Sequence, residues 1–366
     1  MMKYSFAQPL LKIENQFNAQ LPKMLVQNKV PGLSIALIFN GETVYTDAFG
    51  VADNGSQEAL TVDTLFEACS LSKPAFAYVV MMLVENGRLS LDVPLSNYLP
   101  NPYIDNPLID QITARHVLSH QTGFPNWRPD CWGPTGWEPE GKPLRIAFEP
   151  VSRFSYSGEG YMYLQRVIEH LLGTDGESIM QTHLFQPLEI QPSSYLFSTN
   201  DSPSCAKGHD EKGKPFDKFQ SRKMISAASL HTTPALFAKL LCAIMTPAQT
   251  SGHLSKASLN EMVSQQVPLN NSRNWHKDWP EPTIEIEPNL GWSLGWGIQN
   301  VNDQPAIWHW GDNYSFRAFT LAFLDEGVGI VAMANGANAT SLWKPICEMA
   351  FGGTYPAFDW LEKVFG

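Results

Sequence analysis

The sequence has no hydrophobic run of about 18 residues, the length that a transmembrane helix requires. Basic side chains are also scarce, since 25 Lys and Arg stand against 36 Asp and Glu for a net charge of −11. Nucleic acids and anionic membrane surfaces are bound by basic faces. We therefore expect no nucleic acid and no membrane as a partner.

Cysteines are few, and their spacing does not suggest disulfide pairs. The five of them are widely spaced, with no Cys-x-x-Cys motif. In 366 residues this predicts free thiols rather than a disulfide framework. The first 16 residues hold no apolar stretch typical of a signal peptide. Together these features predict a cytoplasmic protein, with a periplasmic or secreted protein whose leader has been removed as the alternative.

Strand-like patterns lie at both ends of the chain and helical patterns in its middle. Residues 32–50 form two apolar runs around Asn40-Gly41, which is typical of a tight β-hairpin turn. Further strands are predicted at 291–299, 305–311, 316–324 and 327–335. Helices are predicted at 10–28, from about 70 to 85, at 159–172, at 233–246 and after 340. The order predicts an α+β fold with an antiparallel sheet flanked by helices.

The same order predicts two domains. Residues 1–72 and 220–366 would form an α/β domain built from both termini. Residues 73–219 would form an inserted, mostly helical domain, and the active site would lie between the two.

Three Ser-x-x-Lys motifs are present, beginning at Ser70, Ser204 and Ser341. At the head of a helix this spacing puts the Lys amine beside the Ser hydroxyl, where it can take the hydroxyl proton. The helix N-terminus adds partial positive charge where an oxyanion would form. Ser70 alone precedes a long apolar helix, so we choose it as the candidate nucleophile. Its alternative role is that of an N-cap hydroxyl.

Seven segments, in this order, resemble one known group of enzymes. They are FEACSLSK (66–73), ENGRLSLDVPLSNYLP (85–100), HVLSHQTGFP (116–125), RFSYSGEGY (153–161), AASLHTTPALFAKLL (227–241), LGWSLGWGI (290–298) and HWGDN (309–313). The group comprises the serine hydrolases related to class C β-lactamases, with penicillin-binding DD-peptidases, D-aminopeptidases and β-lactamase-like carboxylesterases. The resemblance implies a β-lactamase/transpeptidase-like fold and hydrolysis through an acyl-enzyme.

The resemblance also implies roles for individual residues. Ser70 would be acylated and Lys73 would activate it. Tyr156 would share the acid–base work, and we expect Lys73 to stabilise its phenolate and lower its pKa. His309 stands in a strand motif that is Lys-Thr-Gly in many relatives. The backbone amides of Ser70 and Asp312 would form the oxyanion hole.

Four further residues are expected to border the substrate: Trp127, Gly158, Trp310 and Gly311. Trp127 lies in a tryptophan-rich loop and would wall a pocket, although it could simply cover the helical domain. Gly158 stands where class C β-lactamases have an Asn that can hold a β-lactam amide. His309 replaces a permanently cationic Lys with a group that is neutral above its pKa. Both departures favour esters or small amides and peptides, with a true β-lactamase or DD-carboxypeptidase as the alternative.

Other interpretations of the sequence are less well supported. Gly291 to Gly295 match the Gly-x-Ser-x-Gly elbow, which needs a strand, a turn and a helix, whereas this segment is predicted to be one strand. His116 and His120 have a spacing that could bind a metal, but no third ligand is evident. We expect no metal and no cofactor. A non-catalytic, ligand-binding member of the fold is the alternative of another class.

Overall fold

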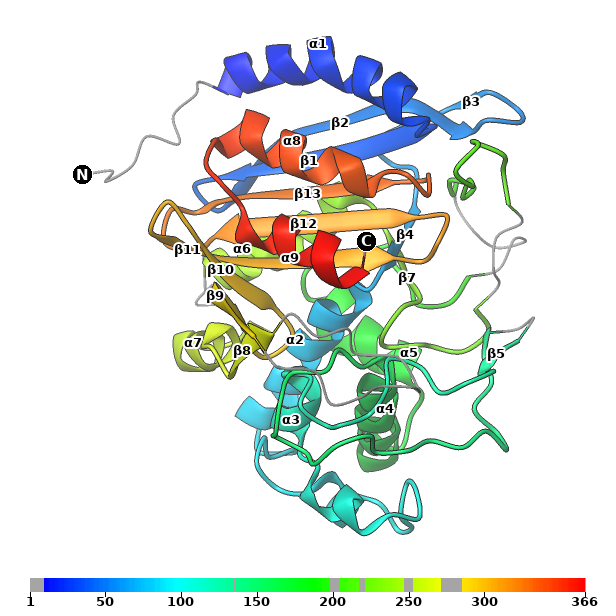
Figure 1. Ribbon diagram of the computed structural model, residues 1–366, viewed down its shortest axis with the longest axis vertical. Coiled ribbons are helices and arrows are strands. Elements are labelled where there is room, and N and C mark those ends of the chain that lie inside the picture. Colours follow the sequence, from blue (N-terminus) through cyan, green and yellow to red (C-terminus); the bar gives the residue numbers. More distant parts are fainter. Residues whose placement is uncertain are drawn as a thin grey trace.

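The structure, a computed structural model, describes residues 10–133, 136–197, 204–216, 221–246, 253–270 and 285–365 (Figure 1). Nine strands in these ranges form one antiparallel sheet in the order β3-β2-β1-β13-β12-β11-β10-β9-β8. The strands are β1 (Gly32–Phe39), β2 (Glu42–Asp53), β3 (Glu58–Ala59), β8 (Val267–Asn270), β9 (Ile286–Trp292), β10 (Gly297–Val301), β11 (Gln304–Asp312), β12 (Arg317–Phe323) and β13 (Val328–Ala334). The two halves of the chain meet where β1 pairs with β13, with Leu33 opposite Ala334.

Helices cover both faces of this sheet (Figure 1). α1 (Leu10–Asn28), α8 (Thr340–Phe351) and α9 (Pro356–Phe365) lie on one face, and α6 (Pro234–Met245) packs on the other. Alternate residues of a strand point to opposite faces. Accordingly, Leu33, Ile35 and Leu37 join the core under α1 and α8, whereas Ala36 and Ile38 join the core under α6.

The middle of the chain forms the mostly helical part below the sheet in Figure 1. Its elements are α2 (Ser72–Glu85), η1 (Leu95–Tyr98), η2 (Pro107–Gln111), α3 (Ala114–Leu118), β5 (Trp132–Gly133), β6 (Gly136–Trp137), α4 (Gly158–Leu172), α5 (Gly176–Met180) and η3 (Gln181–Phe185). The short strands β4 (Phe66–Cys69) and β7 (Leu230–Thr232) pair beside it, and α7 (Lys256–Val263) follows α6. The domain boundaries after residues 72 and 219 stay a prediction.

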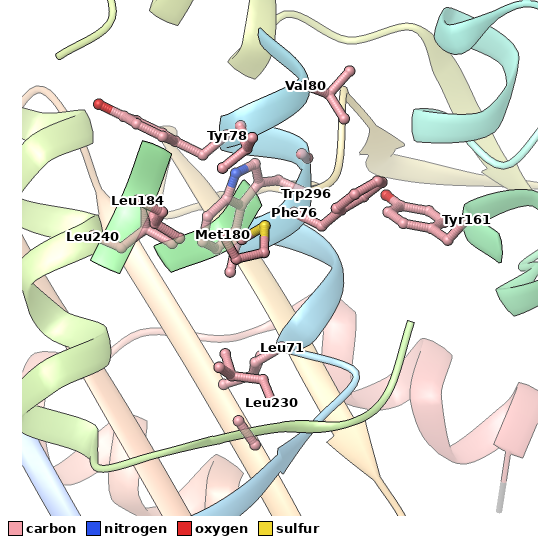
Figure 2. Close-up of a cluster of buried hydrophobic side chains, with 14 of the residues drawn as sticks. Leu71, Phe76, Tyr78, Val80, Tyr161, Met180, Leu184, Leu230, Leu240 and Trp296 are labelled. Atoms are coloured by element: carbon pink, nitrogen blue, oxygen red, sulfur yellow. The ribbon is translucent and has the colours of Figure 1, made fainter. Parts of the chain in front are cut away.

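α2 runs through the hydrophobic core, and every residue from Ser72 to Leu83 is buried. Figure 2 shows side chains of α2 packed among residues from α4, η3, β7, α6 and the turn that contains Trp296. Within this cluster the rings of Phe76 and Tyr161 lie 6.2 Å apart. A helix that is apolar on all sides is stable in water only when other parts of the protein cover it on all sides. The apolar sequence of α2 therefore explains its central position in the core.

Most predicted elements are confirmed. The β1–β2 hairpin turns at Asn40-Gly41, where both residues have positive φ. The helices at 10–28, 159–172 and 233–246 match α1, α4 and α6 within one or two residues. In the described ranges, no helix is both long and apolar enough to cross a membrane.

The single strand predicted at residues 291–299 is wrong. β9 ends at Trp292 and β10 begins at Gly297, so the segment is a hairpin. The cause is Gly295, whose φ is +94° and whose Cβ, if present, would lie 2.5 Å from that of Ala77 on α2. The elbow interpretation of Gly291 to Gly295 fails as well, because a strand rather than a helix follows the turn.

Candidate active site

Ser70 lies in the turn between β4 and α2 and is partly exposed. The N-cap of α2 is Leu71, with no side-chain hydrogen bond, so Ser70 does not cap the helix. The preceding Cys69 has a φ of +52°, and its buried thiol donates to the carbonyls of Glu67 and Phe316. A non-glycine residue in this region costs about 1–2 kcal/mol, so the turn needs the surrounding contacts to hold it.

Lys73 is buried on the first turn of α2, with 1% of its surface exposed. Its Nζ lies 3.1 Å from Ser70 Oγ and donates to the carbonyl of Ala227 at 2.8 Å. Burial holds the pKa of Lys73 well below its usual range, because the ammonium form has lost its water. The site therefore favours a neutral amine, which keeps a lone pair beside the Ser70 hydroxyl.

Tyr156 lies in the segment before α4, and Lys73 Nζ is 4.7 Å from the centre of its ring. The expectation of a lowered phenol pKa is wrong. Burial raises the pKa of Tyr156, and the nearby Ser70 side chain offsets only part of that increase. Burial disfavours the ammonium form of Lys73, and so disfavours the positive charge that would stabilise a phenolate. Tyr156 therefore keeps its proton.

His309 and Trp310 are neighbours on β11. His309 is fully buried, and its Nδ1 donates to the carbonyl of Trp310 at 2.7 Å. Burial is the main reason why the pKa of His309 is lowered to about 3, so the ring is neutral, as the sequence predicts. The Trp310 ring packs 4.8 Å from Tyr156 and 5.7 Å from Trp360 of α9. This packing makes the Trp310 side chain a support for Tyr156 and does not favour the predicted contact with substrate.

Gly311 brings β11 against the turn that contains Ser70. A Cβ at Gly311 would lie 2.7 Å from the Cβ of Cys69 and 2.8 Å from the carbonyl of Ala68. Strand β10 pairs with β11 only as far as Trp308, so residues 309–312 continue past it. The contact therefore places residues 311–312 beside residues 69–70, which contain the two predicted oxyanion-hole amides.

Asp312 ends β11 with an exposed side chain. Its carboxylate pairs with Arg317 at 2.7 Å and accepts a hydrogen bond from the Tyr314 amide at 2.8 Å. These contacts fix the turn after β11. The role predicted for Asp312 concerns its backbone amide, and that role stays a prediction.

Trp127 covers Gly158 at the start of α4. Gly158 donates its N–H to the backbone and side-chain oxygens of Asn126, at 2.9 and 3.0 Å. A Cβ at Gly158 would lie between 2.6 and 2.9 Å from three atoms of the Trp127 indole. The indole thus occupies the space that a side chain at position 158 would need. The Trp132 ring lies at its edge, 4.8 Å away.

The ion pair that holds this loop escaped the sequence analysis. Glu159 is fully buried, and its Oε2 lies 2.7 Å from Arg128. Its Oε1 also accepts from the Arg128 amide and from the Trp137 indole. A carboxylate in the first turn of α4 is well placed for the helix dipole. The only sign in the sequence was an acidic residue just after the predicted helix start.

A cavity of about 300 Å³ lies beside Trp127 and Asp312. Its other lining residues are Glu67, Trp132, Ile225, Ala228, Ser229, His231 and Asn313. Asn313 donates to Glu67 at 2.9 Å and to the Ala228 carbonyl at 3.2 Å. A groove of about 1230 Å³ along α4 and α5 shares Ile225 with this cavity. The predicted site residues all lie within the described ranges, and none of them lines this groove.

The other two Ser-x-x-Lys motifs lie away from this site. Lys207 pairs with Asp53 at 2.8 Å, and Lys344 pairs with Asp359 at 3.2 Å. The choice of Ser70 from context is thus consistent with the structure.

His116 and His120 do not share a ligand site. The His116 Nδ1 contacts the Gln111 carbonyl and the Thr113 amide, whereas the His120 Nδ1 accepts from the Ser157 amide. No group of three His, Cys, Asp or Glu suited to a metal occurs within the described ranges.

Comparison with known proteins identifies the family. The model of the Beta-lactamase family matches residues 12–343. The chain belongs to the Beta-lactamase family. It is 25% identical over 354 residues to penicillin-binding protein 4 of Amycolatopsis lactamdurans, a match that covers 89% of this chain and 86% of that protein. It is 22% identical over 341 residues to protein flp of Staphylococcus aureus (strain N315), covering 88% of this chain but only 64% of that longer protein.

Solved structures agree on the fold of this family member. A D-alanine carboxypeptidase AmpC from Burkholderia cenocepacia superposes with a TM-score of 0.74 at 19% identity, covering 93% of this chain and 98% of that one. An octameric penicillin-binding protein homologue from Pyrococcus abyssi gives 0.72 at 22% identity, covering 89% and 74%. The predicted β-lactamase/transpeptidase-like α+β fold is confirmed.

Replacing Gly311 tests the close approach of β11 to the Ser70 turn. We expect Gly311→Ala to cost about 1–3 kcal/mol of unfolding free energy through overpacking. Because the turn must shift, ester hydrolysis should fall at least about 10-fold. The control is Gly141→Ala, at a glycine with a φ of +71° and no atom near its absent Cβ. The control should lose stability with normal turnover, and normal turnover in Gly311→Ala would refute the requirement.

The low pKa of His309 predicts a dependence of stability on pH. Between pH 6.5 and about 3, the unfolded chain binds a proton at His309 that the folded protein does not bind. The free energy of unfolding must therefore decrease as the pH is lowered through this window. This residue contributes up to about 1.4 kcal/mol per pH unit to the decrease. Urea unfolding between pH 7 and 4 should show a flatter dependence for His309→Gln. Equal slopes in the two proteins would show that the ring is not held neutral.

Proposed function

We propose that this protein is a serine hydrolase that forms an acyl-enzyme on Ser70 and acts on esters or small amides and peptides. One observation carries the proposal. A buried lysine amine with a depressed pKa lies 3.1 Å from a partly exposed serine hydroxyl at the head of a helix. Serine is a weak nucleophile until a neighbouring base takes its proton.

Acylation uses the neutral form of Lys73. Its Nζ lone pair accepts the Ser70 proton as Oγ attacks the substrate carbonyl. The amides of Ser70 and Asp312 receive the negative charge that develops on the carbonyl oxygen. Such preorganised donors typically contribute about 10²–10³-fold each to the rate.

Tyr156 acts as the acid in this scheme. Its raised pKa keeps the phenol protonated, and the Ser70 side chain and Lys73 Nζ, 4.7 Å from the ring centre, are its neighbours in the site. The phenol gives its proton to the leaving oxygen or nitrogen, and the proton held by Lys73 replaces it. Water then attacks the acyl-Ser70 ester with the same groups acting in reverse, and Ser70 regains its proton.

Two features of the site favour substrates without a carboxylate or an acylamino group. The neutral His309 brings no positive charge to the site. The Trp127 indole fills the space beside Gly158. The cavity of about 300 Å³ suits a small acyl group. The penicillin-binding and carboxypeptidase relatives keep DD-carboxypeptidase and β-lactamase activity as the alternatives to test.

A fluorophosphonate tests the nucleophile directly. Intact mass should increase by one phosphonyl group in the wild type and in Ser72→Ala, whose serine is fully buried. Ser70→Ala should gain no mass and lose about 10³-fold or more in ester turnover. Unchanged ester hydrolysis in Ser70→Ala would exclude the assignment. No adduct on folded wild type would instead favour a ligand-binding member of the fold.

The contact between Trp127 and Gly158 corrects a simple expectation about β-lactams. The family pattern predicts that Gly158→Asn improves β-lactam acylation, but its Cβ would strike the indole. We expect Gly158→Asn alone to lose about 1–3 kcal/mol of stability without that gain. Trp127→Ala removes the obstacle, so the double variant should acylate faster with a chromogenic cephalosporin than Trp127→Ala does. No gain in the double variant would show that position 158 does not set this preference.

A further inference from the structure

His120 lies directly behind the active-site tyrosine. It follows α3, is fully buried and has a φ of +57°. A non-glycine residue in this left-handed region is uncommon. Its backbone conformation allows the carbonyl and the side chain to face the same segment, residues 154–158.

The residues on either side of Tyr156, Ser155 and Ser157, both donate their backbone N–H to His120. The Ser155 N–H donates to the His120 carbonyl at 2.7 Å, and the Ser157 N–H donates to the His120 Nδ1 at 3.0 Å. A nitrogen that accepts this bond carries no proton, so the ring is the neutral tautomer with its proton on Nε2. Burial holds the pKa of His120 well below its usual range, because the protonated ring would lose its water, and so favours that form.

The imidazole also supports the ring of Tyr156. The two ring centres lie 4.3 Å apart at an angle of 35°. Trp292 and Phe154 contact the imidazole edge-on at 5.3 and 5.7 Å, so the imidazole itself cannot shift freely. Three separate contacts from one residue thus define the position of Tyr156.

We propose that His120 is a positioning residue that holds Tyr156 in place against Ser70 and Lys73. This inference rests on the proposed function of Tyr156 as the acid. His120 does not touch the reacting atoms. It acts by fixing the backbone on both sides of the tyrosine and by stacking on its ring.

A double-mutant cycle separates this role from a general structural one. His120→Phe keeps a ring but removes the Nδ1 acceptor, and His120→Asn keeps an acceptor and tolerates positive φ. Each is made in the wild type and in Tyr156→Phe, and kcat and KM for an ester are measured with the thermal midpoint. We expect His120→Phe to lower kcat about 10–100-fold, within the usual worth of an acid–base group, with little change in KM. His120→Asn should retain more activity.

The decisive measurement is the effect of the His120 variants on kcat in the Tyr156→Phe background. If His120 acts through Tyr156, its variants should cost little more once the phenol is gone. The proposal would be overturned if His120→Phe lowered kcat by the same factor in both backgrounds. It would also be overturned if His120→Phe kept full activity while Tyr156→Phe had low activity. If His120→Phe does not fold, His120→Asn takes its place. Its smaller decrease in kcat must then disappear in the Tyr156→Phe background.

The matched control is His116→Asn, one helical turn earlier. Its ring bonds the Gln111 carbonyl and the Thr113 amide, neither of which belongs to the proposed site, so we expect normal kinetics even if the midpoint falls. Full activity in Tyr156→Phe itself would contradict the proposed acid and therefore the basis of the inference. That outcome is distinct from a failure of His120 alone.

Discussion

Lys73 Nζ has been removed from water and keeps two close oxygen neighbours, the Ser70 hydroxyl and the Ala227 carbonyl. Burying an ammonium is costly unless an opposite charge compensates, and within the described ranges no carboxylate forms an ion pair with it. The amine escapes that cost by giving up its proton, which is the state that a base requires. The burial of α2 on every side creates this condition. The hydrophobic core and the proposed chemistry therefore depend on the same packing.

Three glycines let segments around the site approach one another closely. A Cβ at Gly295 would strike Ala77 of α2, one at Gly311 would strike the turn before Ser70, and one at Gly158 would strike Trp127. Each position serves a different part of the site: the depth of Lys73, the distance from β11 to Ser70, and the space beside the tyrosine. Gly295 and Gly311 thus leave room for close backbone contacts. At Gly158, the Trp127 indole fills the space in which class C β-lactamases have an Asn side chain.

Much of this architecture follows from the sequence, because hairpin turns and apolar helix patterns are local signals. Asn40-Gly41 and the residues of α1, α4 and α6 illustrate this. The hairpin around Gly295 could not be predicted, since the alternation of Trp292, Leu294 and Trp296 imitates a strand. At the site, motifs brought out Ser70, Lys73, Tyr156 and His309. The protonation states did not follow, because they depend on burial that only the assembled fold reveals. For the same reason the Glu159–Arg128 pair and the contacts of His120 escaped the sequence analysis.

The proposed neutral state of Lys73 is tested most directly by the pH dependence of fluorophosphonate labelling at Ser70, measured in the wild type and in Tyr156→Phe. If buried Lys73 is the base, the labelling rate should level off well below the ordinary lysine pKa of about 10.4. The midpoint should be the same in both proteins, because the phenol is not the group that titrates. A rate that keeps rising to pH 10, or a midpoint that disappears with the phenol, would contradict the account.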